Sequence, residues 1–220
     1  MNVLLFGATG MVGQGVLREC LLDPDVRRVL SVGRRATGVQ HPKLHELVVP
    51  DLMDYSAVQK QLAGYDACFF CLGVSSVGMS EEDYRRVTCD ITLAAARLLV
   101  RLNPQMSFIY VSGAGTDSSE RGPRMWARVK GETENALMRL PFKAAYMFRP
   151  GFIQPLHGVR SRTAVYRWIY LLLGPLFGLV RRLAPNRVTT SEQLGRAMLV
   201  AAKRGARAPL VEMPDINALR

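Results

Sequence analysis

Residues 2–16 read NVLLFGATGMVGQGV, in which an apolar run is followed by glycines at positions 7, 10 and 13. The run predicts a buried strand, and the apolar spacing from Val12 onward predicts a helix. Glycines at this junction permit a tight turn, close approach of the backbone to a pyrophosphate, and close packing of the helix on the strand. The amino end of the helix adds unpaired N–H groups and the positive end of its dipole. We therefore expect a phosphate site, the alternative being a merely tight turn, formed by Gly7, Thr9, Gly10, Met11, Val12 and Gly13.

Apolar runs and helical patterns alternate along most of the remaining chain. Several of the apolar runs are continuous rather than alternating, which is typical of parallel strands covered by helices on both faces. The sequence therefore predicts an α/β fold, a Rossmann-type doubly wound parallel sheet with a small C-terminal lobe. Strands are expected at 2–7, 26–34, 45–51, 66–73, 106–113 and 143–151, and helices at 11–22, 56–64, 80–102, 124–140 and 192–205.

At 220 residues the chain is expected to form one domain. Residues 1–150 carry the alternation of strands and helices and form the expected dinucleotide-binding core. Residues 151–220 are expected to be a C-terminal substrate or lid lobe plus the final helix, integral to the same domain. This lobe is placed over the carboxyl edge of the sheet, where open α/β sheets bind ligands.

The composition indicates a globular protein with a basic surface. Apolar residues make up 49% of the chain, charged residues make up 21%, and the net charge is +11. This charge fits a solvated basic surface, an anionic ligand or an anionic membrane face. No run of basic and aromatic residues matches a nucleic-acid-binding module, so no nucleic-acid partner is expected. The histidines stand apart from any cysteine or carboxylate at ligand spacing, and no metal is expected.

Cys68 and Cys71 form a CxxC pattern inside the strand expected at 66–73. Residues three apart on a strand point to opposite faces, so we expect no disulfide between them. Free buried thiols indicate a reducing compartment. The amino end also lacks the basic region and cleavage site of a signal peptide, and a cytoplasmic location is therefore expected.

The residues after the second expected strand bear on which dinucleotide is bound. Sites for NAD often place an acidic residue about 20 residues beyond the glycine turn, where it contacts the ribose hydroxyls. This chain has Arg34 and Arg35 there. Arginine accommodates a 2′-phosphate, so NADP is expected rather than NAD. The alternative is a solvated arginine pair.

Further nucleotide contacts are expected where the third and fourth strands end. Asp51, followed by Leu52, is placed to meet the adenine edge, or else it is an ordinary polar strand end. Leu72 and Gly73 would let the backbone lie along the adenosine ribose. The alternative for Gly73 is a glycine required only by the turn.

With these residues the chain resembles the atypical short-chain dehydrogenase/reductase superfamily, and within it the Tat-interacting-protein-like NAD(P)-binding proteins. The resemblance covers roughly residues 1–205 and rests on GATGMVG, FIYVSGAG, VKGETE, FRPGFI and VTTSEQLGRAML. It implies a Rossmann-type sheet, a bound dinucleotide and an active-site cleft beside the nicotinamide. It also implies that Ser112 polarises a substrate, that Lys130 holds the ribose, and that Pro150 and Gly151 line the nicotinamide pocket.

Active members of this superfamily carry a Tyr-x-x-x-Lys pair, and this chain has Trp126 in place of the tyrosine. An indole N–H donates a hydrogen bond but does not ionise in a useful range, so Trp126 cannot transfer the proton. Three accounts stay open. The proton comes from Tyr84 or from a water held by Ser112; the protein binds NADP without turnover; or Trp126 is a core residue of an amphipathic helix.

Residues 165–183 combine leucines and aromatic residues with flanking arginines. This pattern fits a membrane surface contact, a homodimer contact or a hydrophobic lid. The sequence as a whole predicts an NADP-binding protein. One hypothesis is that it is an oxidoreductase or epimerase with an altered proton donor and an unidentified small-molecule substrate. The alternatives are a non-catalytic NADP-sensing interaction protein and a membrane-peripheral module.

Overall fold

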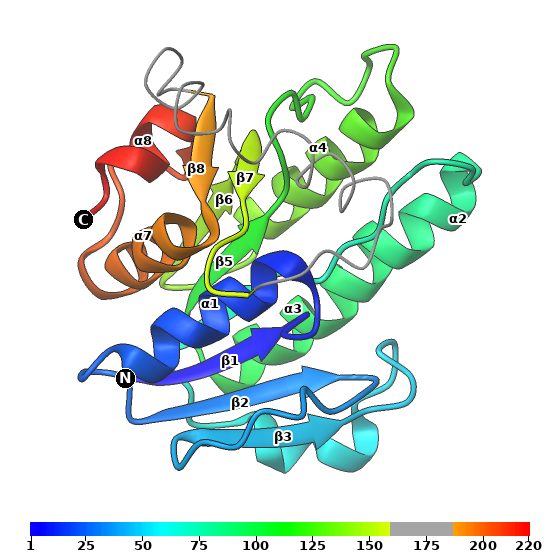
Figure 1. Ribbon diagram of the computed structural model, residues 1–220. Helices are drawn as coiled ribbons and strands as arrows, with labels where there is room; N and C mark the ends of the chain where they lie inside the picture. Colours follow the sequence, from blue (N-terminus) through cyan, green and yellow to red (C-terminus); the bar gives the residue numbers. More distant parts are fainter. Residues whose placement is uncertain (159–186) are drawn as a thin grey trace.

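The computed structural model describes residues 1–158 and 187–220, and this part of the chain forms a helix–sheet–helix sandwich (Figure 1). The central sheet has the strand order β3-β2-β1-β4-β5-β6-β9, and every neighbouring pair is parallel. The expected Rossmann-type, doubly wound parallel sheet is therefore confirmed. Its strands are β1 (Asn2–Phe6), β2 (Arg28–Gly33), β3 (Leu44–Val48), β4 (Ala67–Phe70), β5 (Ser107–Val111), β6 (Ala144–Phe148) and β9 (Leu210–Val211).

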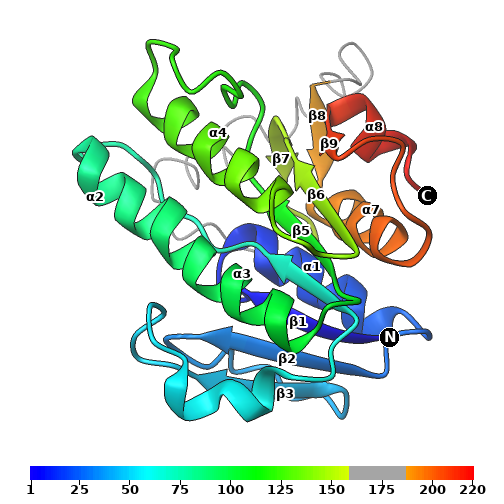
Figure 2. The ribbon, with the colours of Figure 1, turned by 180° about the vertical axis from the view of Figure 1, so that it is seen from behind.

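Helices cover both faces of this sheet (Figures 1 and 2). α1 and α7 lie on one face, α3 and α4 lie on the other, and a separate apolar cluster fills the space under each layer. The central strands lie between two apolar clusters, which explains why their sequences are continuously apolar. The helices are α1 (Met11–Leu22), α2 (Glu81–Arg85), α3 (Ile91–Leu102), α4 (Met125–Met138), α7 (Ser191–Arg204) and α8 (Met213–Ala218), with a short 3-10 helix at Ser56–Leu62.

The helix expected at 80–102 is confirmed, with one irregular turn inside it. α2 continues through a π-helical turn at Arg86–Asp90 into α3. The hydroxyl of Ser80 caps the amino end, because it accepts a hydrogen bond of 3.1 Å from the backbone N–H of Asp83. α3 ends at Leu102, directly before Asn103.

Short elements in the C-terminal part were not expected from the sequence. β7 (Phe152–Gln154) and β8 (Val188–Thr190) pair in parallel as a separate two-stranded sheet. β9 extends the central sheet beside β6, and α8 follows it. Strands of two or three residues are too short to show a periodic pattern, which is why none was predicted.

The final helix begins as expected, because the side chain of Thr190 accepts a hydrogen bond of 3.0 Å from the backbone N–H of Gln193. The apolar segment 165–183 lies outside the described residues. The membrane, homodimer and lid hypotheses for it therefore stay predictions.

Two glycines bring α1 and α7 into close contact. A Cβ atom on Gly15 would lie 2.7 Å from the Cβ of Ser191, and one on Gly195 would lie 2.9 Å from the Cγ of Glu19. Any larger side chain would force the helices apart, because packed interiors have little free volume. A helix from the far end of the sequence thus holds the helix that follows the glycine turn.

The CxxC pattern is not a disulfide. Cys68 belongs to the apolar cluster under α3 and α4, whereas Cys71 packs against the cluster under α1 and α7. The two side chains therefore point to opposite faces of the sheet, and both thiols are free. Burial raises the pKa of both, so they are inert core thiols.

Candidate functional site

The turn between β1 and α1 has a backbone that its glycines alone allow. Gly7 adopts a left-handed conformation, with φ of +79°, and a Cβ there would lie 2.6 Å from the backbone of Cys71 and Leu72. A Cβ on Gly13 would lie 2.0 Å from the carbonyl oxygen of Gly7. Gly10 N–H donates to the same carbonyl at 2.9 Å. The turn is therefore pulled tightly under the start of α1.

The amino end of α1 is free to bind an anion. Gly10 is its N-cap and brings no side-chain cap, and no acidic residue occupies the first turn. The N–H groups of this turn, which includes Met11 and Val12, are therefore left for a ligand together with the positive end of the helix dipole. These features fit the pyrophosphate of a dinucleotide, as the glycine spacing predicted.

A cleft of about 320 Å³ opens beside this turn. Arg34 and Arg35 border it and are solvent-exposed, and no acidic side chain of the described residues lines it. Ser31 also borders the cleft, although its place inside a buried strand gave no signal in the sequence. The lining residues are Gly7, Ala8, Thr9, Ser31, Val32, Gly33, Arg34, Arg35 and Leu72. The structure thus brings the glycine turn, the arginine pair and Leu72 together.

Three other predicted nucleotide contacts lie apart from the lining of this cleft. Asp51 is exposed, and its carboxylate accepts a hydrogen bond of 2.8 Å from the N–H of Met53. The side chain of Leu52 is 3% exposed and packs in the core, so it does not face a ligand. Gly73 is exposed, with open space where a Cβ would stand.

Ser112 follows β5 at the carboxyl edge of the sheet, as expected, but its hydroxyl has protein partners. The hydroxyl oxygen lies 2.5 Å from a carboxylate oxygen of Glu134 and 3.1 Å from the carbonyl oxygen of Phe148. The side chain is 7% exposed. A substrate that is to be polarised by Ser112 would have to compete with these partners.

Lys130 reaches the same strand end from α4. Its ammonium group donates a hydrogen bond of 2.5 Å to the backbone carbonyl of Ser112. Burial lowers the pKa of Lys130 to about 8, and the nearby carboxylate of Glu134 opposes this shift. An amine with such a pKa exchanges protons near neutral pH.

Behind these two residues lies a buried ion pair that the sequence patterns did not indicate. Glu134 is fully buried, and both of its carboxylate oxygens accept hydrogen bonds from the guanidinium of Arg149. The same guanidinium donates to Glu212 at 3.1 Å and to the hydroxyl of Ser118 at 2.5 Å. The hydrogen bonds to Glu134 and, to a smaller extent, to Glu212 raise the pKa of Arg149. The pair joins α4, the end of β6, the loop after β5 and the start of α8.

Trp126 is a partly buried residue that packs against the core. Its ring lies at the edge of the apolar cluster under α3 and α4, and a Cβ on Gly115 would come 3.6 Å from it. The interpretation of Trp126 as a packing residue is therefore the one that its contacts favour. Tyr84, the alternative proton donor, is 2% exposed within the same cluster, and burial raises its pKa. Tyr84 is therefore in no position to reach a substrate.

Pro150 and Gly151 lie beside the loop that follows β5. The backbone N–H of Ala114 donates to the carbonyl of Pro150 at 2.9 Å. A Cβ on Gly151 would lie 3.8 Å from the side chain of Ala114 and 3.0 Å from the carbonyl of Arg187. The two residues thus stand at the sheet edge near Ser112, and their contact with a nicotinamide stays a prediction.

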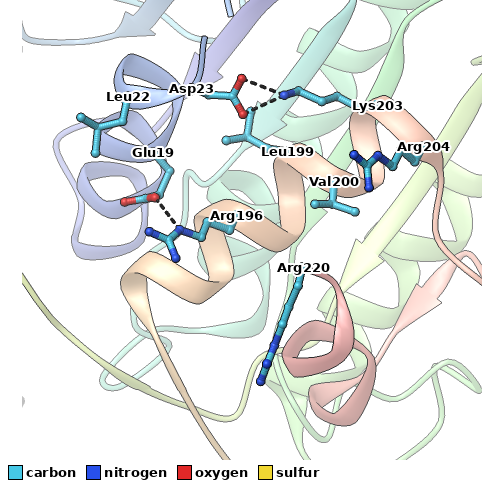
Figure 3. Close-up of a pocket in the computed structure, with 9 residues that line it drawn as sticks. All are labelled: Glu19, Leu22, Asp23, Arg196, Leu199, Val200, Lys203, Arg204 and Arg220. Atoms are coloured by element: carbon cyan, nitrogen blue, oxygen red, sulfur yellow. Dashed lines mark hydrogen bonds and ion pairs between the residues drawn. The ribbon is translucent and has the colours of Figure 1, made fainter. Parts of the chain in front are cut away.

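A second hollow, of about 370 Å³, lies between α1 and α7 (Figure 3). Its carboxylates are already paired with protein cations, since Arg196 binds Glu19 and Lys203 binds Asp23. It lies where α1 ends, away from the glycine turn. We assign no ligand to it.

The sequence matches a family model described as NAD(P)H-binding over residues 7–141. HTATIP2 of Rattus norvegicus is 27% identical over 155 residues, which are 69% of this chain and 62% of that protein. The mitochondrial protein fmp52 of Emericella nidulans is 28% identical over 159 residues, covering 69% of this chain and 66% of that protein. These alignments span just under two thirds of the relatives, whereas FMP52-1 of Scheffersomyces stipitis, 23% identical, is matched over 91% of its length and 89% of this chain.

Solved structures share the fold. The enzyme WbmF of Bordetella bronchiseptica, solved in complex with NAD+, superposes with a TM-score of 0.67 over 99% of this chain and 76% of that one, at 14% identity. A short-chain dehydrogenase/reductase family oxidoreductase from Burkholderia thailandensis gives a TM-score of 0.65 over 95% of this chain and 89% of that one, at 16% identity.

The relatives contradict the expected cytoplasmic location. Several FMP52 proteins, from Emericella nidulans, Scheffersomyces stipitis and Candida albicans among others, are named as mitochondrial. Free thiols indicate only a reducing environment, which does not single out the cytoplasm. Within residues 1–158 and 187–220, no helix has the length and apolar character needed to cross a membrane.

The glycine turn, the uncapped helix and the sheet order agree with the sequence match over 7–141. The chain belongs to the NAD(P)H-binding family, and its fold is the one seen in the solved short-chain dehydrogenase/reductase structure.

Proposed function

We propose that this protein binds NADP(H) in preference to NAD(H). One observation carries the proposal: Arg34 and Arg35 border the cleft at the end of β2, where an acidic residue would favour NAD. Both arginines are exposed, and neither forms an ion pair with another described residue. Their guanidinium groups are therefore available to a 2′-phosphate.

The order of the strands indicates where the remainder of the dinucleotide would lie. The pyrophosphate would lie over the turn at Gly7–Gly10, which sits between β2 and β4 in the sheet. The nicotinamide half would then extend past Leu72 towards Ser112 and Lys130 at the end of β5. The proposal thus gives the two ends of the cofactor separate protein partners.

A fluorescence titration of the protein with NADPH and with NADH tests this. A charge-assisted hydrogen bond contributes about 1.5–3 kcal/mol, so the Arg34→Ala/Arg35→Ala variant should bind NADPH about 10- to 100-fold more weakly. Binding of NADH should change by less than about threefold, because NADH has no 2′-phosphate. Arg27→Ala, an exposed arginine directly before the opposite end of β2, is the matched control and should bind both nucleotides like the wild type.

The proposal is wrong if the wild-type protein binds NADH as tightly as NADPH. It is also wrong if the double variant binds NADPH and NADH more weakly by the same factor, since the arginines would then contact a part of the dinucleotide that NADH also has.

A further inference from the structure

The proposed function leaves the source of a proton open, because the tyrosine position is occupied by Trp126. We propose that Lys130 is the general acid of this protein and donates a proton to the oxygen of a carbonyl substrate. The inference rests on the proposed binding of NADP(H) and extends it to a reaction. It assigns to one lysine both the contact with the cofactor and the proton that a phenol would otherwise supply.

The ammonium nitrogen of Lys130 lies 2.5 Å from the carbonyl oxygen of Ser112, at the carboxyl edge of β5. The strand order places β5 two strands from β1, whose turn forms the phosphate site. Since neighbouring strands are about 4.8 Å apart, Lys130 stands about 10 Å along the sheet edge from that turn, on the nicotinamide side. An ammonium has three N–H donors, and one of them is used on Ser112.

The other ionisable groups around Lys130 are not placed to donate a proton to a ligand. Glu134 lies one turn further along the same helix, but its side chain is fully buried and both of its carboxylate oxygens accept hydrogen bonds from the guanidinium of Arg149. Tyr110 of β5 and Tyr84 of α2 are both at most 2% exposed, and burial raises the pKa of each. None of these groups combines a transferable proton with access to a ligand.

Burial lowers the pKa of Lys130 to about 8, so most of the protein carries the ammonium form at pH 7, and its proton is weakly held. Asp117, in the loop that leads from β5 to α4, has its pKa lowered by the hydroxyl and backbone donors around it and stays a carboxylate. A single acid with a pKa near the working pH is what proton transfer requires.

NADPH, held by the glycine turn and the arginine pair, would supply the hydride that reduces the carbonyl carbon and would leave as NADP+. The electron pair of the C=O bond would move to the oxygen. Lys130 breaks one N–H bond and gives that proton to the oxygen, which forms the alcohol. The neutral amine of Lys130 then takes a proton from water before the next turnover.

Substitution by arginine separates the two roles of Lys130. Arginine keeps a positive charge and N–H donors, but its pKa is above 12, so it does not release a proton. Lys130→Arg should therefore bind NADPH within about threefold of the wild type, while reduction of a probe carbonyl falls by about 10²- to 10⁴-fold. Suitable probes are 4-nitrobenzaldehyde and 2,3-hexanedione, followed by the loss of NADPH absorbance. Lys143→Arg, an exposed lysine before β6, is the control and should behave like the wild type.

A direct readout of the proton does not depend on turnover. The chain has five lysines, Lys43, Lys60, Lys130, Lys143 and Lys203, so ¹³C-labelled lysine gives a simple NMR spectrum. One side-chain signal should titrate with a midpoint of about 8 and be absent in Lys130→Arg. The kcat/KM of the wild type should fall above the same pH, because the acid form is lost.

The results distinguish a failure of the role given to Lys130 from a failure of the proposed NADP(H) binding. If NADPH binds but Lys130→Arg reduces the probes at the wild-type rate, or the Lys130 signal titrates near 10, the inference is wrong and the proposed function stands. If NADPH binds and the wild type reduces neither probe, the inference is also overturned. If NADPH does not bind, the proposed function itself fails.

Discussion

Gly131 stands in the middle of α4, where alanine would ordinarily stabilise a helix by about 1 kcal/mol. The structure predicts the opposite effect for Gly131→Ala. A Cβ at this position would lie 1.8 Å from the carbonyl oxygen of Asp117, whereas ordinary contact begins at 3.4 Å. The loop after β5 lies directly on the helix at this glycine, so it would have to be pushed outward by more than an ångström.

The expected size follows from three contributions. Overpacking of this kind costs about 1–3 kcal/mol. Moving the loop also breaks the 3.1 Å hydrogen bond from the N–H of Asp117 to the carbonyl of Ala127, which contributes about 1 kcal/mol. The gain in helix propensity offsets about 1 kcal/mol of this loss. The net loss is about 1–3 kcal/mol, which for a chain of this size corresponds to a Tm lower by roughly 2–12 °C.

Urea denaturation followed by circular dichroism measures the free energy of unfolding directly. Gly73→Ala is the matched control, since a Cβ there meets nothing within 4 Å, and its free energy of unfolding should stay within about 0.5 kcal/mol of the wild type. If Gly131→Ala is as stable as the wild type or more stable, helix propensity decides the outcome and the reasoning from loop contact is refuted.

Two further predictions concern the buried charges. The pKa of Lys130 is lowered to about 8 in the folded protein and is about 10.4 in an unfolded chain, so the unfolded state binds more protons and stability should rise between those pH values. Lys130→Met should abolish this rise and increase the free energy of unfolding at pH 7 by on the order of 2 kcal/mol. Urea denaturation at pH 7 and at pH 10 measures both effects. If the wild-type protein is no more stable at pH 10 than at pH 7, the lowered pKa of Lys130 is contradicted. Arg149→Met leaves the fully buried Glu134 without its cation and should lower stability by about 3–5 kcal/mol in the same assay at pH 7, whereas an unchanged denaturation midpoint would show that the ion pair is not needed.

The fold was largely predictable because its signals are local. The six strands expected from the sequence are all present. In β1, β2, β4 and β5, burial on two faces imposes a continuously apolar composition, whereas the edge strand β3 is largely exposed. β7, β8 and β9 are formed by two or three residues whose pairing depends on distant partners, and such pairing leaves no periodic trace. The glycine turn was also predictable from a local signal, because three closely spaced glycines determine its backbone conformation.

The site was predictable only in part. Arg34 and Arg35 border the cleft because they follow a strand whose end is fixed by the sheet. The direction of the Ser112 hydroxyl was not predictable, because it depends on Glu134 and Phe148, which lie on a neighbouring helix and strand. The ion pair of Arg149 was not predictable either, since an arginine in a sequence is usually a surface residue.

The contact of Gly15 with Ser191 and of Gly195 with Glu19 sets a lower limit on the piece of this chain that can fold. The match to the NAD(P)H-binding family ends at residue 141, yet the helix that presents its N–H groups to the phosphate is covered by α7, some 50 residues further on. An N-terminal fragment cut at the family boundary would expose the apolar face of α1 to water. The boundary drawn by sequence similarity is therefore not a boundary of the folding unit, and any excised nucleotide-binding module has to carry α7 with it.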